Sequence, residues 1–135
     1  MTLQYSVAVR NARLDAVEST IGTSAILEIR SGSAPANCAA ADSGTLLASM
    51  TLPSDWLAAA SSGTKAKSGT WQDASADNAG TAGHFRIKDS GGTTCHAQGT
   101  VTATGGGGDL TLDNTSIAAG QAVTISSFTL TAGNA

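Results

Sequence analysis

The first 22 residues place apolar side chains at helical spacing. Five of them share one stripe at 3.6 residues per turn: Leu3, Val7, Leu14, Val17 and Ile21. Charged side chains occupy the opposite face, and Gly22 follows where a helix commonly stops. The pattern predicts one amphipathic α-helix over residues 1–22. A helix this short is stabilised mainly by docking its apolar stripe, so the five stripe residues are candidate assembly contacts.

From residue 25 onward the apolar period changes to two, which is typical of strands. Residues 25–30 and 45–52 alternate in this way and are separated by a Ser-, Gly- and Ala-rich segment, so they predict two strands joined by a long loop. Two interpretations of Trp56 remain open: a short helical turn, or a continuation that carries the indole into the core. Residues 61–70 contain no apolar anchor and predict an exposed loop.

The segment 83–101 predicts a β-hairpin. If residues 90–92 close a three-residue loop, Ile87 faces Cys95 and Phe85 faces Ala97. One register then sorts the whole segment by polarity. We expect four side chains to point inward: Phe85, Ile87, Cys95 and Ala97. We expect six to point outward: His84, Arg86, Lys88, Thr94, His96 and Gln98.

The last third of the chain predicts further short strands. The glycine run 105–108 indicates a mobile loop or a tight bend. Residues 109–113 and 122–130 alternate, and a parity shift at residues 126–127 indicates a bulge or a corner between sheets. With seven or eight strands, the sequence predicts a mainly β fold, an antiparallel β-sandwich or jelly-roll with one N-terminal amphipathic α-helix. We expect a single domain over residues 1–135, with the helix in 1–22 and the sandwich in 25–132.

Composition indicates a thin core. Ala, Gly, Ser and Thr supply 75 of the 135 residues, whereas Leu, Ile, Val and Phe supply 23. A domain with so few large apolar side chains is expected to gain part of its burial from neighbours, which favours a homo-oligomer. A net charge of −3 without a basic run disfavours nucleic acid as a partner. Without an apolar span or a signal-peptide pattern, we expect synthesis in a cytoplasm and no membrane partner.

Candidate metal and calcium sites are weakly supported. His84 and His96 with Asp89 could bind a metal, but Arg86 and Lys88 on the same predicted face would repel it. The acidic residues at 73 and 77 could suggest a calcium loop, but no glutamate follows, so Asp73 and Asp77 are expected to cap turn amides.

Other candidate chemistry is weaker still. The glycine run 105–108 lacks the Lys-Ser/Thr of a phosphate loop. Cys38 and Cys95 are expected to be thiols, with a disulfide as the alternative, and the predicted register separates Cys95 from both histidines. Trp56, Trp71 and Tyr5 could form a sugar-binding platform, but the tryptophans are expected in the core. We expect no enzymatic activity, no cofactor and no metal.

The chain resembles a group of small virion proteins of tailed bacteriophages. The resemblance covers most of the sequence and is carried by residues 1–22, Leu27-Glu28-Ile29-Arg30-Ser31-Gly32-Ser33-Ala34-Pro35, 73–77 running into 80–87, 109–117 and 128–135. It transfers no catalytic residues. It implies a virion component, made in the host bacterial cytoplasm, without saying which one.

Three functions are compatible with these patterns. The first is a capsid decoration or cement protein that binds the assembled head, with the major capsid protein as the expected partner. The second is a tail or head-tail joining subunit with ring-forming contacts. The third, from another class, is a carbohydrate-binding module of a receptor-binding apparatus.

Overall fold

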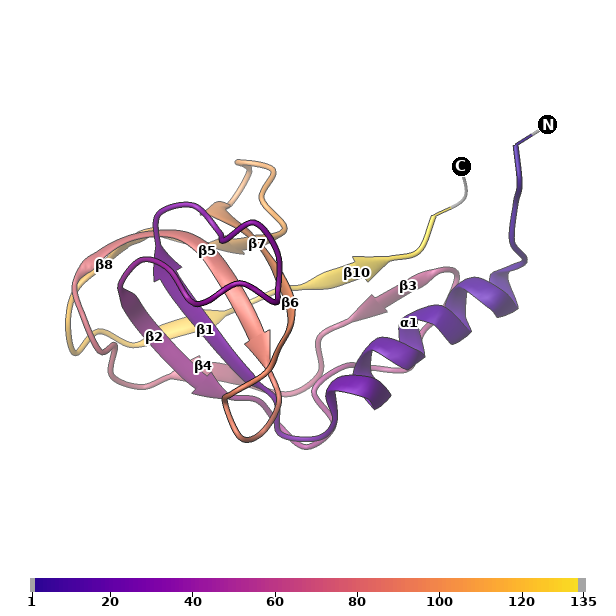
Figure 1. Ribbon diagram of the computed structural model, residues 1–135, viewed down its shortest axis with the longest axis horizontal. Coiled ribbons are helices and arrows are strands. Elements are labelled where there is room, and N and C mark those ends of the chain that lie inside the picture. Colours follow the sequence, from indigo (N-terminus) through magenta and orange to yellow (C-terminus); the bar gives the residue numbers. More distant parts are fainter. Residues whose placement is uncertain (1, 134–135) are drawn as a thin grey trace.

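The computed structural model describes residues 2–133, which form one helix and ten strands (Figure 1). Met1, Asn134 and Ala135, which belong to the stretches that carry the resemblance, lie outside the described residues. The elements in chain order are α1 (Val7–Ile21), β1 (Ile26–Ser31), β2 (Leu46–Thr51), β3 (Thr64–Ala66), β4 (Trp71–Asp73), β5 (Gly80–Lys88), β6 (Cys95–Ala103), β7 (Leu110–Leu112), β8 (Ser116–Ile117), β9 (Val123–Ile125) and β10 (Thr129–Thr131). The predicted mainly β class with an N-terminal helix is confirmed, and the sheets curl into a sandwich-like body.

The main sheet has the order β2-β1-β5-β6-β7, and β8 pairs with β5. Its strand pairs are antiparallel except β6–β7, which is parallel. Ala25, Leu27 and Ile29 are fully buried, as period-two alternation predicts for the core side of a strand. The glycine run before β7 forms a tight return in which Gly108 donates its N–H to Thr102 Oγ1 at 3.0 Å. A Cβ at Gly108 would meet the Thr102 side chain at 2.8 Å, so this position needs glycine.

An aromatic cluster fills the centre of the body. The ring of Trp71 lies 5.9 Å from that of Trp56 and 5.5 Å from that of Phe128, and Phe128 meets Phe85 edge-on at 5.8 Å. Trp56 is fully buried and its indole N–H donates to the Gly22 carbonyl at 2.9 Å. This contact decides the alternative at Trp56: the indole lies in the core. It also joins the end of α1 to the body.

An arm built from α1, β3 and β10 projects from this body (Figure 1). β3 and β10 pair only with each other as a two-stranded sheet, whereas β9 pairs with β4 in the body. The chain therefore passes from body to arm between β9 and β10, alongside the passage from β4 to β3, and the Lys67 N–H donates to the Phe128 carbonyl at 2.8 Å between the two ladders. The pairing shifts by one residue there, so the parity shift at residues 126–127 corresponds to a bulge-like irregularity.

The helix begins later than residue 1. The Ser6 hydroxyl accepts the Val9 N–H at 3.2 Å and caps the first turn, so Leu3 lies in the segment before α1. At the other end the Gly22 N–H bonds to the Glu18 carbonyl and the helix stops. The predicted stop is confirmed, whereas the predicted start is about one and a half turns too early.

The prediction of an exposed loop over residues 61–70 is wrong, because β3 lies within it. Lys65 in this strand is only 3% exposed, and its ammonium group contacts Asp15 Oδ1 of α1 at 2.7 Å. The strand is held by backbone pairing with β10 and by this ion pair rather than by apolar side chains. A pattern search for alternating apolar residues has no signal to detect there.

The predicted hairpin exists, but its register is shifted by two residues. Phe85 faces Gly99 and Ile87 faces Ala97, and a bulge after Ile87 brings Lys88 opposite Cys95. The connecting loop is longer than three residues because the Asp89 carboxylate accepts backbone N–H groups of the loop at 3.2 and 3.5 Å. Phe85 and Ile87 point into the core as expected. The expectation for Cys95 is wrong: its sulfur lies on the opposite face, beside the Arg86 guanidinium.

The expectation of an outward, exposed polar face on β5 is also wrong. His84, Arg86 and Lys88 are buried because the loop between β1 and β2 folds over that face of the sheet. Two residues of β6 show how far the loop between β1 and β2 covers the sheet. Gln98 is half-buried with its amide donating to the Pro35 carbonyl at 2.7 Å, whereas His96 is exposed as predicted.

Candidate functional site

The candidate assembly stripe is divided by the structure into a buried and an exposed part. Leu14 and Ile21 are buried, and Val17 packs against the core while remaining half-buried. Leu3 is 70% exposed and Val7 47% exposed. The first part therefore stabilises the subunit itself, and the second part is accessible to a neighbour.

The exposed part belongs to a larger surface that we term the N-terminal apolar patch. It consists of Leu3, Tyr5, Val7 and Val9, at the end of the arm. The Arg13 guanidinium lies 5.4 Å from the centre of the Tyr5 ring. Helical spacing alone did not include Tyr5 and Val9, but one signal could have found them: residues 1–9 contain no charged side chain.

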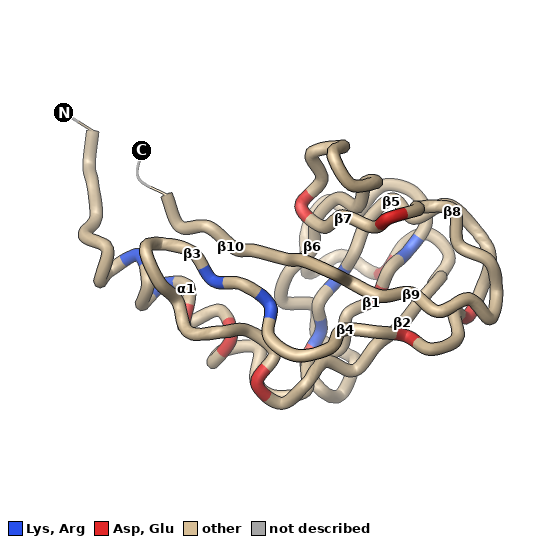
Figure 2. Tube along the Cα trace, turned by 180° about the vertical axis from the view of Figure 1, so that it is seen from behind, with Lys and Arg blue, Asp and Glu red and all other residues tan. Residues whose placement is uncertain are grey.

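The polar face of α1 attaches the helix to the rest of the arm and to the segment that leads into β3. Asn11 Oδ1 accepts the Gly63 N–H at 2.8 Å, and Glu18 Oε2 accepts the Leu57 N–H at 2.6 Å. The hydrogen bond from Lys65, followed by that from the Ala60 N–H, lowers the pKa of Asp15. In Figure 2 the acidic positions of α1 lie beside the basic position of β3, Lys65. The helix is thereby held in one orientation, with its first turn pointing away from the body.

A groove of mixed polarity lies where the arm meets the body. We term this cavity of about 530 Å³ the arm groove. Its apolar lining comes from α1, β5, β6 and β10, and includes Val17, Ile21, Phe85, Ile87, Ala97 and Leu130. Among its lining residues only Asp109 is charged. Its lining also includes Gln98, Thr129 and Thr131, so a cavity of this size can take apolar side chains together with polar groups of a backbone.

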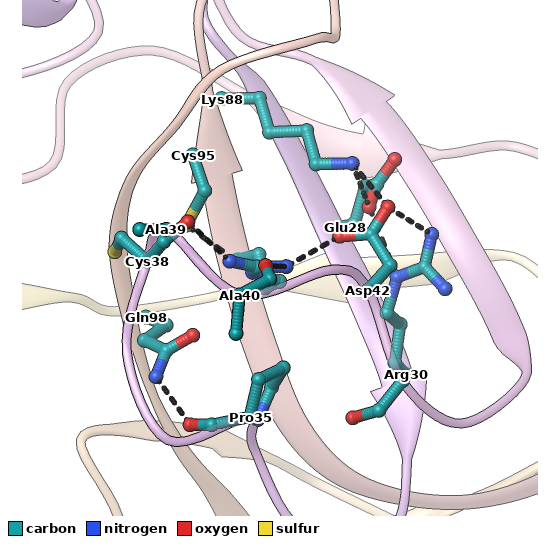
Figure 3. Close-up of polar contacts among 12 residues, drawn as sticks. Glu28, Arg30, Pro35, Cys38, Ala39, Ala40, Asp42, Lys88, Cys95 and Gln98 are labelled. Atoms are coloured by element: carbon teal, nitrogen blue, oxygen red, sulfur yellow. Dashed lines mark hydrogen bonds and ion pairs between the residues drawn. The ribbon is translucent and has the colours of Figure 1, made fainter.

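A second arrangement, the covered polar cluster, lies beneath the loop between β1 and β2 (Figure 3). Its members are Glu28, Arg30, Asp42, Arg86 and Lys88. Lys88 Nζ donates to Asp42 Oδ2 at 2.6 Å and contacts Glu28 Oε1 at 3.0 Å. Arg30 donates to the same two carboxylates. Asp42 is thus the loop residue that meets the basic side chains of the sheet.

Arg86 holds the covering loop at several points. Its guanidinium donates to the carbonyls of Cys38 and Ala40 at 2.8 and 3.1 Å, to Asp42 Oδ1 at 2.6 Å, and to Cys95 Sγ at 3.2 Å. The side chain is 2% exposed. Every nitrogen of the guanidinium is thereby occupied within the chain. The geometry is that of an internal clamp, because four of the five guanidinium N–H groups donate to acceptors within the chain.

The titration of the cluster follows from its ion pairs. Burial opposes ionisation of Asp42, but hydrogen bonds from Lys88 and Arg86 outweigh it, so the pKa of Asp42 lies below its usual value. Burial likewise opposes the charged form of Lys88, and bonds to Asp42 and Glu28 reverse this, so the pKa of Lys88 is raised. Both groups remain ionised near neutral pH, which suits a permanent ionic contact rather than proton transfer.

The two cysteines are free thiols on the covered face of the sheet. Burial, followed by the neighbouring Cys95, raises the pKa of the Cys38 thiol. The Cys95 thiol donates to the Ala97 carbonyl at 3.4 Å while accepting from Arg86. A thiol kept protonated is a poor nucleophile, so Cys38 lacks the activation that cysteine catalysis requires.

The remaining candidates from the sequence are not brought together into a site. His84 is fully buried with Nδ1 2.9 Å from the Gly32 carbonyl oxygen, whereas His96 is exposed. No group of three His, Cys, Asp or Glu side chains suited to a metal occurs among residues 2–133. The Asp73 carboxylate accepts the N–H groups of Ser49 and Ser75, as expected for a turn cap.

The aromatic residues do not form a sugar-binding platform. Trp56 and Trp71 are fully buried, as the core interpretation predicts, and neither ring face is accessible. Tyr5 is exposed and precedes α1, whereas both tryptophans belong to the core of the body.

Comparisons with family models, curated proteins and solved structures return no match. In the described part of the chain, no helix has the length and apolar character that crossing a membrane requires.

Proposed function

We propose that this chain is a non-enzymatic structural protein of a bacteriophage virion, a capsid decoration or cement protein that binds the assembled head. The N-terminal apolar patch is the observation that carries the proposal. In a chain with so few large apolar side chains, four of them are exposed within residues 3–9, at the end of a projecting arm. Exposed apolar patches of this kind mark surfaces that are buried in an assembly. The resemblance of the sequence to small virion proteins of tailed bacteriophages indicates that this assembly is a virion.

The internal use of the polar groups supports a structural role. The side chains with the strongest ionic contacts hold the covering loop, and the aromatic residues of the body fill its core. The arm then carries the exposed apolar side chains that a partner could contact. Its partners in this proposal are further copies of the chain and the major capsid protein.

Binding through the patch is expected to depend little on salt. Residues 1–9 carry no charged side chain, so ionic screening has few interactions to weaken there. Apolar contacts and backbone pairing would supply the affinity instead. Removal of residues 1–22 should therefore abolish particle binding at low and at high ionic strength alike.

A tail or head-tail joining subunit is the second candidate. The specific observation in its favour is that the patch and the arm groove occupy different parts of one chain. Two different surfaces that complement each other give head-to-tail contacts, and such contacts close into rings. The carbohydrate-binding alternative has no comparable support, since the tryptophans that suggested it are buried.

Immunogold electron microscopy tests the proposal. Antibodies against this chain are applied to purified tailed-phage particles whose genome encodes it, with particles lacking the gene as the control. Label over the head supports the decoration protein, and label over the tail or the joining region supports the second candidate. Particles that carry no label, and in which mass spectrometry finds no peptide of this chain, would refute both.

A further inference from the structure

We propose that residues 2–6 of one subunit dock as an added strand in the arm groove of a second copy of this chain. The inference rests on the proposed structural role and names the partner of the N-terminal apolar patch. Its basis is a match between a groove bordered by unpaired strand edges and an uncharged segment with apolar side chains.

The groove offers backbone as well as apolar surface. β6 pairs with β5 along one side, but on its other side β7 covers only Val101–Ala103, so the stretch 95–99 has no strand beside it among the described residues. β10 likewise pairs with β3 on one side only. Residues from both of these edges line the arm groove. An unpaired edge beside a cavity with apolar side chains is the arrangement that accepts an added strand.

The N-terminal segment has the properties of such a strand. Residues 2–6 precede α1 without forming a helix or strand of their own, the backbone of Ser6 is extended, and none of the five carries a charged side chain. In an extended chain Leu3 and Tyr5 project to one side, and Thr2, Gln4 and Ser6 to the other. One side would therefore enter the arm groove while the other faced solvent. The near-absence of charge in the lining of the groove matches this neutral segment.

A second copy is the occupant that the arrangement favours. The N-terminal segment leaves the far end of α1 and points away from the body (Figure 1). Between Val7 and Ile21 the helix advances about 21 Å, which separates the segment from the base of the arm. The donor and the acceptor surfaces thus lie apart on one chain. Repeated docking of one onto the next gives a head-to-tail assembly that closes into a ring or continues as a filament.

Two matched variants of the full chain test the donor side. Leu3→Asp places a carboxylate on the side that enters the groove, and Gln4→Asp places the same charge on the adjacent, solvent-facing side. In sedimentation velocity over a range of concentrations, the unchanged chain and Gln4→Asp should self-associate equally. Leu3→Asp should weaken association at least about tenfold, since the burial of one leucine contributes an order of magnitude or more in affinity.

A mixing experiment tests the acceptor side. Ala97→Glu is half-buried in the groove and should block it while leaving the donor segment intact. Circular dichroism and tryptophan fluorescence establish that it is folded, and Leu130→Glu serves as a second groove variant if it is not. Each defective chain alone should be monomeric. A mixture of Leu3→Asp with the groove variant should form a one-to-one dimer, because one intact donor and one intact acceptor remain.

Three outcomes would overturn the docking: a monomeric unchanged chain, equal effects of Leu3→Asp and Gln4→Asp, or no dimer in the mixture. These outcomes are separate from those of the virion test. Gold label on particles together with a monomer in solution refutes the docking and retains the proposed function. An oligomer that follows the expected pattern, without label on particles, retains the docking and refutes the virion role.

Discussion

Replacement of Arg86 by methionine should cost the protein about 3–4 kcal/mol of unfolding free energy. Two of the lost hydrogen bonds run from the guanidinium to the backbone carbonyls of Cys38 and Ala40. Hydrogen bonds that involve a charged group contribute about 1.5–3 kcal/mol each, and a buried carbonyl left without a donor loses that contribution. The ion pair with Asp42 adds little, because that carboxylate is 32% exposed and keeps Lys88 and Arg30.

Urea unfolding followed by the fluorescence of the two buried tryptophans measures this cost. With a typical slope for a domain of this size, the midpoint should fall by about 2 M. Arg30→Met is the matched control: its guanidinium contacts only carboxylates that Lys88 also contacts, so it should cost about 1 kcal/mol. If Arg86→Met is no more destabilising than Arg30→Met, the clamp described for Arg86 does not hold the covering loop.

Three further predictions concern the same molecule. The lowered pKa of Asp42 contributes stability above about pH 4 that is lost as the pH falls, and the raised pKa of Lys88 contributes stability below about pH 10 that is lost as the pH rises. The thermal midpoint should therefore stay constant between these two pH limits. If Asp42→Asn loses stability at acid pH as steeply as the unchanged chain, Asp42 is not the source of that loss. Phe85→Ala should cost about 3–5 kcal/mol in urea unfolding because its ring meets the aromatic cluster, whereas His96→Ala, at an exposed position, should change the midpoint by less than the experimental scatter; similar losses would refute the observed register. Cys38 should react with iodoacetamide more slowly than free cysteine at neutral pH because burial raises its thiol pKa, and mass spectrometry showing an equal or faster rate would exclude that environment.

The parts of the fold that the sequence predicted are those that depend on local periodicity. Alternation places Leu27 and Ile29 on the core side of β1, and both are buried as predicted. The parity shift at residues 126–127 also marked the place where the pairing register of the last strands changes. Such signals are local because a side chain's direction is set by its own strand.

The errors arise where burial depends on segments distant in sequence. Alternation assigns Arg86 and Lys88 to the face away from the core, and they do lie there. Whether that face meets solvent depends on Asp42 and its loop, more than forty positions earlier in the chain. A single sequence without an alignment contains no signal for that pairing, and β3 was missed for a similar reason, since its partner strand comes near the end of the chain.

The candidate site was predicted in part. Leu3 and Val7 belong to the predicted stripe and are exposed, whereas Leu14 and Ile21 serve the subunit's own core. Spacing on a helix cannot divide a stripe in this way, because the division depends on how far the arm extends beyond the body. The arm groove lies between elements that only tertiary structure brings together, so no sequence signal pointed to it.

The order of the arm's segments along the chain has a consequence for synthesis on the ribosome. The arm joins α1 from the beginning of the chain to β3 from the middle and β10 from the end, whereas the β2-β1-β5-β6 portion of the main sheet is complete once Ala103 has been made. Contacts between such distant segments form late, so most of the sheet can fold on the nascent chain, whereas the arm cannot form until β10 has been made. A chain released before Thr129 lacks the partner of β3 and cannot complete the arm. Prematurely terminated chains would then also lack the part of the arm groove that Thr129, Leu130 and Thr131 supply, so in the proposed docking they could not accept the segment of a second copy.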